Sequence, residues 1–180
     1  MGLDIVAGAG GLDAVGWRLD LPEPRWERPE QIRAAVMLES PCVAQDDELT
    51  EQLAATVESL AALGVQIDDS ARPDIDIERS HDVYMALLRA ATGTGYSKEA
   101  MVDQKVHGER YAAGDRDDRA VAGRGSSLSH WEWAGFHRER EQERLAWAAF
   151  FEDYDLLLCP TAASAAYPHD HSGERADRTI

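Results

Sequence analysis

The chain has 180 residues and carries 34 acidic against 18 basic side chains, which gives a formal net charge of −16. A field of this sign repels phosphate backbones and anionic lipids, so the composition argues against nucleic-acid and membrane partners. Hydrophobic residues make up 44% of the sequence, which excludes a wholly disordered or collagen-like chain and is typical of one soluble globular domain.

Nothing in the chain predicts export or membrane insertion. The first residues lack the basic region of a secretory signal, and no apolar run approaches the roughly 18 residues of a membrane-spanning helix. The two cysteines, Cys42 and Cys159, lie far apart and form no C-x-x-C motif. We therefore expect a cytoplasmic protein with reduced thiols.

The first elements in chain order form an irregular connector and then a strand. Residues 1–31 are rich in glycine and proline, which predicts little regular structure. Ile32–Leu38 is a short apolar run that reads as a buried strand. Ser40-Pro41 ends it, because the residue before a proline is disfavoured in the helical region.

A helix and a second strand follow. Asp46 or Asp47 can cap the helix, and its apolar face repeats at helical spacing, at Leu49, Leu53, Val57 and Leu60. Gly64 supplies a stop signal, and Val65–Ile67 alternates as a strand does. Strand, helix and strand together predict a βαβ unit with a right-handed crossover.

The middle of the chain reads as helical with interruptions. Ile77–Ala91 has an apolar face made by Val83, Leu87 and Ala91, and the glycines of Thr92–Gly95 break the helix. Residues 98–125 are polar and weakly periodic, which indicates a helix with loose ends and a mobile loop over Ala113–Gly125.

A long helix is expected from Ser129 to Phe151. Ser129 and Glu132 have the spacing of a capping box. The middle of the helix, His137–Arg144, is almost wholly charged, while both of its ends are apolar. This pattern predicts a helix that bridges two packed regions with its waist in solvent, supported by pairs at i,i+3 spacing, namely Arg138/Glu141, Arg140/Glu143 and Glu141/Arg144.

The last predicted element is a buried strand at Asp155–Cys159, after which Pro160-Thr161 turns the chain outward. The elements therefore predict the α/β fold class, with a βαβ unit and long helices. We expect one domain over residues 1–180, composed of the connector 1–31, an α/β segment 32–168 and a polar tail 169–180.

Glycine-rich and serine-rich stretches are weak candidates for chemistry. The run Gly8–Gly11 fails the dinucleotide-binding fingerprint, since Asp13 occupies the position of the final glycine. Ser126 and Ser127 lack a visible base and do not match G-x-S-x-G, so a loop beside the helix cap is favoured over a nucleophile.

The remaining candidates also favour structural roles. His169 and His171 could hold a metal, but they have no third ligand in register. Trp131 and Trp133 could stack on a ring, although packing is the preferred interpretation, and Cys159 reads as an inert buried thiol. The residues taken one by one predict no catalytic, cofactor or metal site.

Four longer segments resemble a known family. The block Phe150–Asp170, FFEDYDLLLCPTAASAAYPHD, resembles a diagnostic stretch of the amidase signature family, which hydrolyses carboxylic amide C–N bonds. Three segments agree with it: GLDAVGWRLDLPEP (11–24), RAAVMLESPCV with the helix and strand after it (33–67), and the long helix 129–151. The resemblance covers nearly the whole chain and implies a partial amidase-signature-like fold, in which the βαβ unit and the long helices pack on an incomplete mixed sheet.

The same resemblance implies which functional residues to seek. The family uses a serine nucleophile, a second serine in a cis peptide bond and a lysine base, all N-terminal to the region matched here. The chain has no G-G-S-S-G-G-S stretch, and Lys98 and Lys105 match no catalytic motif, so no catalytic residue is transferred. The turn after the DLLLCPT strand lies near the family's acyl pocket, which implies that Pro160 and Thr161 line a substrate site, with Ala162 beside them.

Two functional hypotheses follow. In the first, the chain is a middle-to-C-terminal portion of an amidase-type hydrolase, inactive alone, that takes a small-molecule amide substrate once a segment with the Ser/Ser/Lys set completes it. In the second, it is a pseudoenzyme or a non-catalytic acidic protein-interaction module. The strands would then associate with a partner through exposed sheet edges. Pro160 and Thr161 would in that case simply end a strand.

Overall fold

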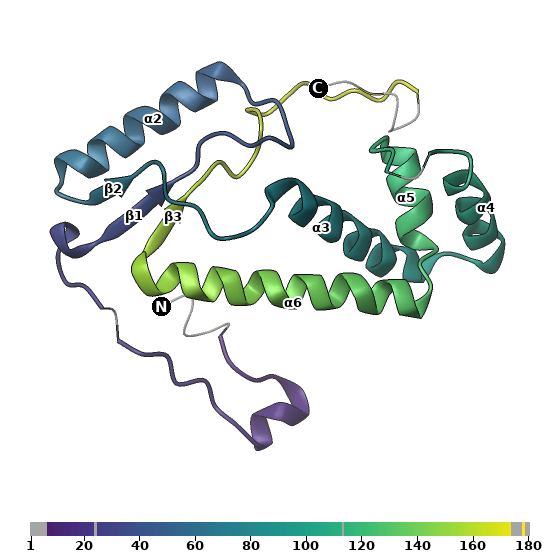
Figure 1. Cartoon of the computed structure of the whole chain (residues 1–180), viewed down its shortest axis with the longest axis horizontal. Coiled ribbons are helices and arrows are strands. Elements are labelled where there is room, and N and C mark those ends of the chain that lie inside the picture. The colour runs from purple at the N-terminus through teal and green to yellow at the C-terminus, as the bar shows by residue number, and fades with distance from the viewer. Residues whose placement is uncertain (1–6, 24, 113, 174–177, 179–180) are drawn as a thin grey trace.

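The computed structural model describes residues 7–23, 25–112, 114–173 and 178 (Figure 1). The elements, in chain order, are η1 (Gly11–Val15), η2 (Pro29–Gln31), β1 (Arg33–Val36), α2 (Asp47–Ala62), β2 (Gln66–Asp68), α3 (Ile77–Thr92), η3 (Gly93–Gly95), α4 (Lys98–Gly108), α5 (Asp118–Ser126), α6 (His130–Asp153) and β3 (Leu156–Leu158). Over these ranges, no helix is both long enough and apolar enough to cross a membrane.

The sheet has the order β2-β1-β3, and both of its pairings are parallel. The α/β class and the βαβ unit β1-α2-β2 are confirmed. The expected mixed sheet is wrong for the described strands, because β3 returns through a long helical excursion and enters parallel to β1. Ala35 of β1 faces Asp68 on one side and Leu157 on the other.

Helix α2 covers one face of the sheet, as its apolar periodicity predicted. Asp46 is the N-cap, and its side chain accepts a hydrogen bond from Leu49 N at 3.0 Å. Gly64 adopts φ +96° directly after the helix, a conformation that favours glycine. The core beneath the helix centres on the buried residues Ile32, Ala34 and Val65, and Leu60 of α2 packs on them.

The predicted mobile loop over Ala113–Gly125 is wrong, because most of it forms the helix α5. Asp117 caps this helix, and its side chain accepts from Arg119 N at 2.9 Å. The glycines in this region permit close approach to a neighbour. A Cβ on Gly123 would lie 2.6 Å from Gly108 N, and a Cβ on Gly125 would lie 2.5 Å from Arg89 Cβ. Glycines that read as breakers in the sequence thus let α5 pack against α3 and α4.

Helix α6 runs from the helical end of the molecule to the sheet (Figure 1), which confirms the bridging role predicted for it. The capping box is confirmed as well. Ser129 Oγ accepts from Glu132 N at 3.3 Å, and the Glu132 carboxylate accepts from Ser129 N at 2.8 Å.

The charged middle of α6, residues 137–144, was predicted to lie in solvent, but some of its side chains form hydrogen bonds with α3. Glu139 accepts two hydrogen bonds from Arg79 of α3, both 2.8 Å long, and Glu143 accepts from Ser80 Oγ at 3.0 Å. Of the pairs expected within the helix, Glu141–Arg144 forms at 2.8 Å. Arg140 instead contacts the neighbouring Glu141 at 3.2 Å. Among the described residues, neither the predicted Arg138/Glu141 pair nor the predicted Arg140/Glu143 pair forms, so these two predictions are wrong.

The two outer strands of the sheet differ in polarity. Strand β2 reads Gln66-Ile67-Asp68, and its polar side chains are hydrogen-bonded to neighbouring segments. Strand β3 reads Leu-Leu-Leu and keeps Leu156 exposed. Because β3 lies at an edge, Cys159 after it is exposed, which corrects the prediction of a buried thiol.

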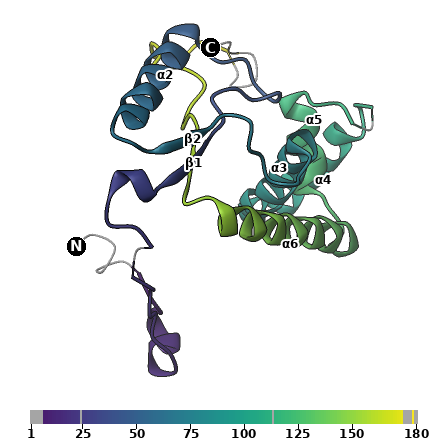
Figure 2. The ribbon, with the colours of Figure 1, turned by 60° about the vertical axis from the view of Figure 1, so that its left-hand side comes forward.

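An arm, defined here as residues 7–23, projects from the body of the molecule (Figures 1 and 2). It contains the short turn η1 and is otherwise irregular, as expected for the connector. Leu12 and Val15 at its tip are 92% and 90% exposed. Arg25 holds its base, with a 2.9 Å ion pair to Asp155 and hydrogen bonds to the carbonyls of Phe151 and Tyr154.

Candidate substrate site

The carboxyl ends of β1, β2 and β3 meet at one edge of the sheet, because the strands are parallel. In open α/β sheets this is the edge outside which ligands bind. Pro160 and Thr161 follow β3 directly, so they lie in a loop at this edge. Pro160 is half-buried, while Thr161 and Ala162 are exposed.

Backbone hydrogen bonds hold this loop at both of its ends. Met37 N, just beyond β1, donates to Leu158 O at 2.9 Å, and Asp46 N donates to Ala163 O at 2.8 Å. The second bond joins the loop to the start of α2. Residues 159–162 are therefore presented between two fixed points, with the Thr161 side chain exposed.

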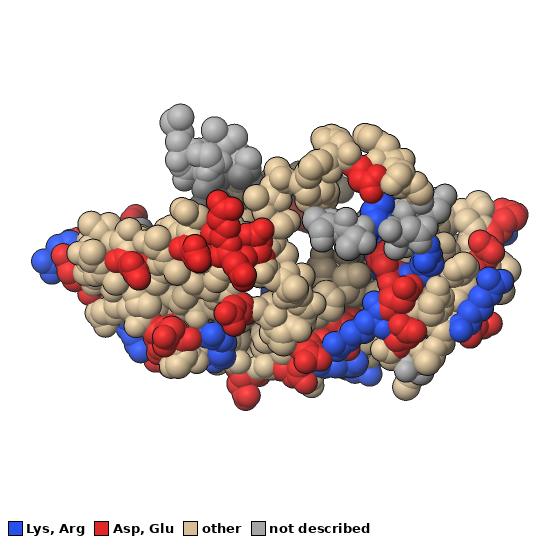
Figure 3. All heavy atoms as spheres, turned by 90° about the horizontal axis from the view of Figure 1, so that it is seen from above, with Lys and Arg blue, Asp and Glu red and all other residues tan. Residues whose placement is uncertain are grey.

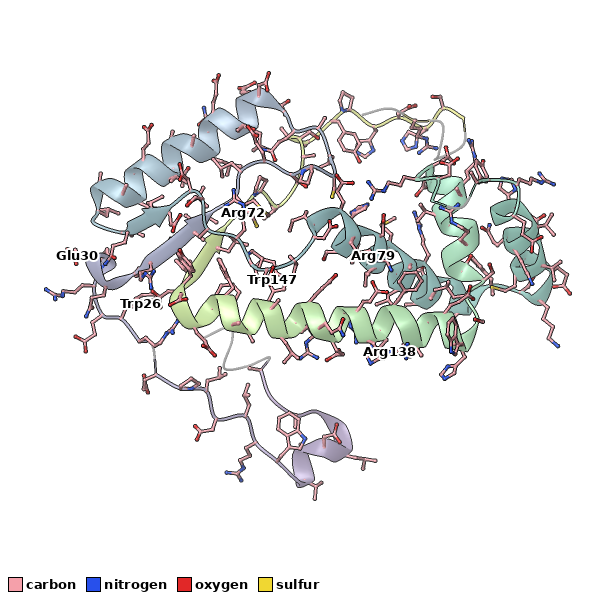
Figure 4. The ribbon with its side chains drawn as sticks, viewed as in Figure 1. Trp26, Glu30, Arg72, Arg79, Arg138 and Trp147 are labelled. Atoms are coloured by element: carbon pink, nitrogen blue, oxygen red, sulfur yellow. The ribbon has the colours of Figure 1, made fainter. Side chains whose placement is uncertain are left out.

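Arg72 reinforces the same edge from the segment that follows β2. One of its terminal nitrogens donates to Val36 O at 2.9 Å and to Ala71 O at 2.7 Å. The guanidinium thereby fastens the end of β1 to the turn after β2, close to the loops described above (Figure 4). Such a charge-assisted contact fixes the position of the backbone at the end of β1.

Asp68 is the last residue of β2 and lies at the carboxyl edge of the sheet, but both of its carboxylate oxygens already accept hydrogen bonds. One oxygen accepts from Tyr154 OH at 2.6 Å, and the other accepts from Ser70 N, Ser70 Oγ and Ala71 N. The bond from Tyr154, followed by those from Ser70, lowers the pKa of Asp68 well below its usual range. The same bond raises the pKa of Tyr154. Asp68 is thus an ionised structural acceptor and a poor general base.

The hydroxyls of the two candidate serines, Ser126 and Ser127, bond to backbone carbonyls and not to a side chain that could act as a base. Ser126 is buried, and its hydroxyl donates to Ala122 O at 2.5 Å. The Ser127 hydroxyl donates to Gly123 O at 2.8 Å. Both hydroxyls bond to the carbonyl four residues earlier, which is what serine does within a helix. The structural interpretation of this serine run fits the geometry.

The remaining candidates from the sequence are the histidines His169 and His171 and the glycine run Gly8–Gly11. No group of three or more His, Cys, Asp or Glu side chains that could bind a metal occurs among the residues the structure describes. The rings of His169 and His171 lie 5.8 Å apart in the exposed tail. The glycines Gly8–Gly11 lie in the arm and lead into η1.

The tryptophans at the start of α6 behave differently from one another. Trp133 stacks on both His130 and His137, with ring centroids 6.1 and 5.0 Å away. Trp131 is 80% exposed, so the prediction that both tryptophans pack is wrong for Trp131. His130 is exposed and His137 is half-buried, so both stacked histidines lie at the surface of the helix.

A pocket of about 960 Å³ lies at the helical end, among α3, α4, α5 and α6. Apolar side chains such as Met85, Val121 and Phe136 line it, together with Lys105 and Glu132. Neither Pro160 nor Thr161 contributes to it. Sequence reasoning missed this pocket because it read α5 as a loop; the N-cap Asp117 was the signal that could have indicated the helix.

Acidic side chains are spread over the face shown in Figure 3, with basic ones among them. This distribution resembles the composition of the whole chain and offers no single-signed basic surface on that face.

Comparison with known proteins gives one match. A family model described as Amidase matches residues 18–179. No curated protein matches the chain, and no solved structure does. The family match covers the three described strands, the helices α2 to α6 and the Pro160–Thr161 loop.

Proposed function

Because the chain belongs to the amidase family, we propose that it forms the scaffold and part of the substrate site of a hydrolase of carboxylic amide C–N bonds. The observation that carries this proposal is the match over residues 18–179, which includes the loop at the carboxyl edge of the parallel sheet. That edge is where open α/β folds bind small molecules.

Pro160 and Thr161 are the proposed substrate-lining residues. Proline offers a stiff apolar wall, and an exposed threonine hydroxyl can donate to an amide oxygen or accept from its nitrogen. The anchoring bonds from Met37 N and Asp46 N support this role, since they hold the loop that carries both residues. A pre-positioned loop loses little freedom when substrate binds.

The chain contains no G-G-S-S-G-G-S stretch, and this supports a site whose catalytic serines and lysine lie outside these 180 residues. Ser126 and Ser127 bond to backbone carbonyls, so neither is proposed as a nucleophile. We assign the nucleophile and its base to another segment, in the same polypeptide or a separate chain, that meets this one at the sheet. β3 is an edge strand of the described sheet and its Leu156 is exposed, so it is the strand we propose for that meeting. We place the protein in the cytoplasm, which agrees with its two free thiols.

The test is ammonia release from a panel of aliphatic and aryl amides. The purified chain is expected to release none, and the chain co-expressed with a segment bearing a family G-G-S-S-G-G-S loop is expected to hydrolyse at least one of them. In the active complex, Thr161→Val should raise KM, while Thr56→Val on the exposed side of α2 should not.

Two results would overturn the proposal. One is a folded complex that never hydrolyses an amide. The other is labelling of Ser126 or Ser127 by an active-serine probe in the chain alone, with ammonia release abolished by Ser126→Ala or Ser127→Ala.

A further inference from the structure

A groove of about 450 Å³ lies between α3 and α6, apart from the candidate substrate site. Its lining is mainly apolar or aromatic, from Val83, Tyr84, Leu87 and Leu88 of α3 and Trp147 of α6. Tyr84 is 59% exposed, and Trp147 lies on the side of α6 that faces α3 (Figure 4). The groove therefore exposes an aromatic surface of the kind that anchors protein contacts.

The arm, residues 7–23, is the complementary feature. Its exposed apolar side chains are Leu12, Val15, Trp17, Leu19 and Leu21. A Cβ placed on Gly10 or Gly11 would meet no atom within 4 Å, so no other segment packs against the arm at these two glycines. So many apolar side chains on one short projecting segment are typical of a surface that binds a protein.

Charge matches the two features to each other. The arm carries three acidic residues, Asp13, Asp20 and Glu23, against the single basic Arg18. The groove is bordered by Arg140 and Arg144, with Glu143 beside them. Both arginines contact Glu141, yet each guanidinium has five N–H donors and keeps some for a further carboxylate.

We propose that the arm of one chain docks into the α3–α6 groove of a second copy, so that two chains exchange arms. A second copy fits because the same sequence contains both halves of the contact. Arg25 fixes the base of the arm to the end of α6, and the arm projects on the side of α6 opposite to α3 (Figure 1). A two-fold dimer would then contain two identical arm–groove contacts. This inference does not depend on the proposed hydrolase function.

The experiment is the mass of the full chain in solution, measured by light scattering on size-exclusion fractions at several concentrations. The wild type is expected to form a dimer. Val15→Asp with Trp17→Asp in the arm should raise the dimer dissociation constant about thirtyfold or more, as loss of an aromatic anchor does. Because the arm packs on no core, circular dichroism of this variant should stay unchanged.

Charge reversal separates this contact from any other dimer. Arg140→Glu with Arg144→Glu should weaken the dimer about tenfold or more, and adding Asp13→Arg with Asp20→Arg should restore it. Arg138→Glu is the matched control, since Arg138 lies on α6 outside the groove lining, on the opposite side of the helix from Trp147 (Figure 4).

Three results would overturn the proposal. They are a wild type that stays monomeric at every concentration, a dimer unaffected by the groove variants, and a quadruple charge reversal that fails to restore association. A monomer whose arm resists limited proteolysis would show that the arm folds onto its own chain, and a monomer with a freely cleaved arm would leave the groove for a different protein.

Discussion

The sheet end of the molecule packs α2 on the strands through branched apolar side chains, whereas at the helical end α4 and α5 approach each other closely at glycines. Under α2, the branched residues Ile32 and Val65 fill the space between helix and strands. Where α5 crosses α4, Gly123 meets Gly108 backbone to backbone. The spacing of apolar residues in the sequence predicts packing through side chains. Close packing at glycines is harder to predict, because a glycine in a sequence usually indicates a break in a helix.

The largest expected effect is at the sheet end. Ile32→Ala removes a buried branched side chain from the core and should lower the free energy of unfolding by about 3 kcal/mol, through lost burial and the cavity it leaves. Urea unfolding measures the loss. Leu145→Ala is the control, because Leu145 is 72% exposed on α6 and should cost less than about 0.5 kcal/mol. Equal losses in both variants would contradict the assignment of the core.

Gly123→Ala tests the opposite principle at the helical end. The added methyl would lie 2.6 Å from Gly108 N and 2.8 Å from Gln104 O, and the backbone cannot yield as a side chain tip can. We expect a loss of about 2 kcal/mol in unfolding free energy from overpacking, with faster amide exchange in α4 and α5.

Gly135→Ala provides the matched control for that variant. Gly135 lies within α6, and its Cβ would meet no atom within 4 Å. Alanine should therefore stabilise the protein by about 0.5–1 kcal/mol through helix propensity. If both alanine variants were stabilising, the close approach of α4 and α5 would be wrong.

Loss of the α6 cap should have a smaller effect. Ser129→Ala removes the oxygen that accepts from Glu132 N and should cost about 1 kcal/mol of unfolding free energy. Ser129→Asp keeps a capping oxygen and should retain most of the stability. Thermal unfolding of the three proteins compares them, and a loss in the aspartate variant as large as in the alanine variant would argue against the cap.

The smallest effect is expected from Tyr154→Phe, and it depends on pH. The hydrogen bond from Tyr154 holds the pKa of Asp68 below its ordinary value of 3.8, so the bond stabilises the folded state above that value. Its contribution is lost as the pH falls through the lowered pKa of the folded state. The stability difference between wild type and variant should thus be constant near neutral pH and shrink in acid. A difference that grows in acid would contradict the hydrogen bond.

The elements whose ends carry local signals could be predicted from the sequence. Asp46, Gly64 and Ser129 each define a helix end by a side-chain or backbone preference, and β1 was recognisable as an apolar run. The order of the strands carries no such local signal, because it depends on where the chain returns after the long, largely helical segment between β2 and β3. For that reason the exposure of Cys159 could not be deduced.

The helical end was only partly predictable for a different reason. Gly108, Gly123 and Gly125 form no periodic apolar pattern that would indicate a helix face. Whether each glycine breaks a helix or allows close packing depends on a neighbouring segment that is distant in sequence. The substrate role of Pro160 and Thr161 came from resemblance alone and stays a prediction. What the structure adds is that their loop is fastened by Met37 and Asp46.

Because the thiol of Cys159 is exposed, a fluorescent dye can be attached next to the candidate substrate site. Cys42, the other cysteine, is half-buried, and its thiol donates to Ile77 O at 3.6 Å, so a maleimide dye should react with Cys159 first. The label would stand one residue before Pro160, at the carboxyl edge of the sheet. A change in the emission wavelength or the anisotropy of the dye would then report, in real time and without mutation, the binding of a molecule at that edge.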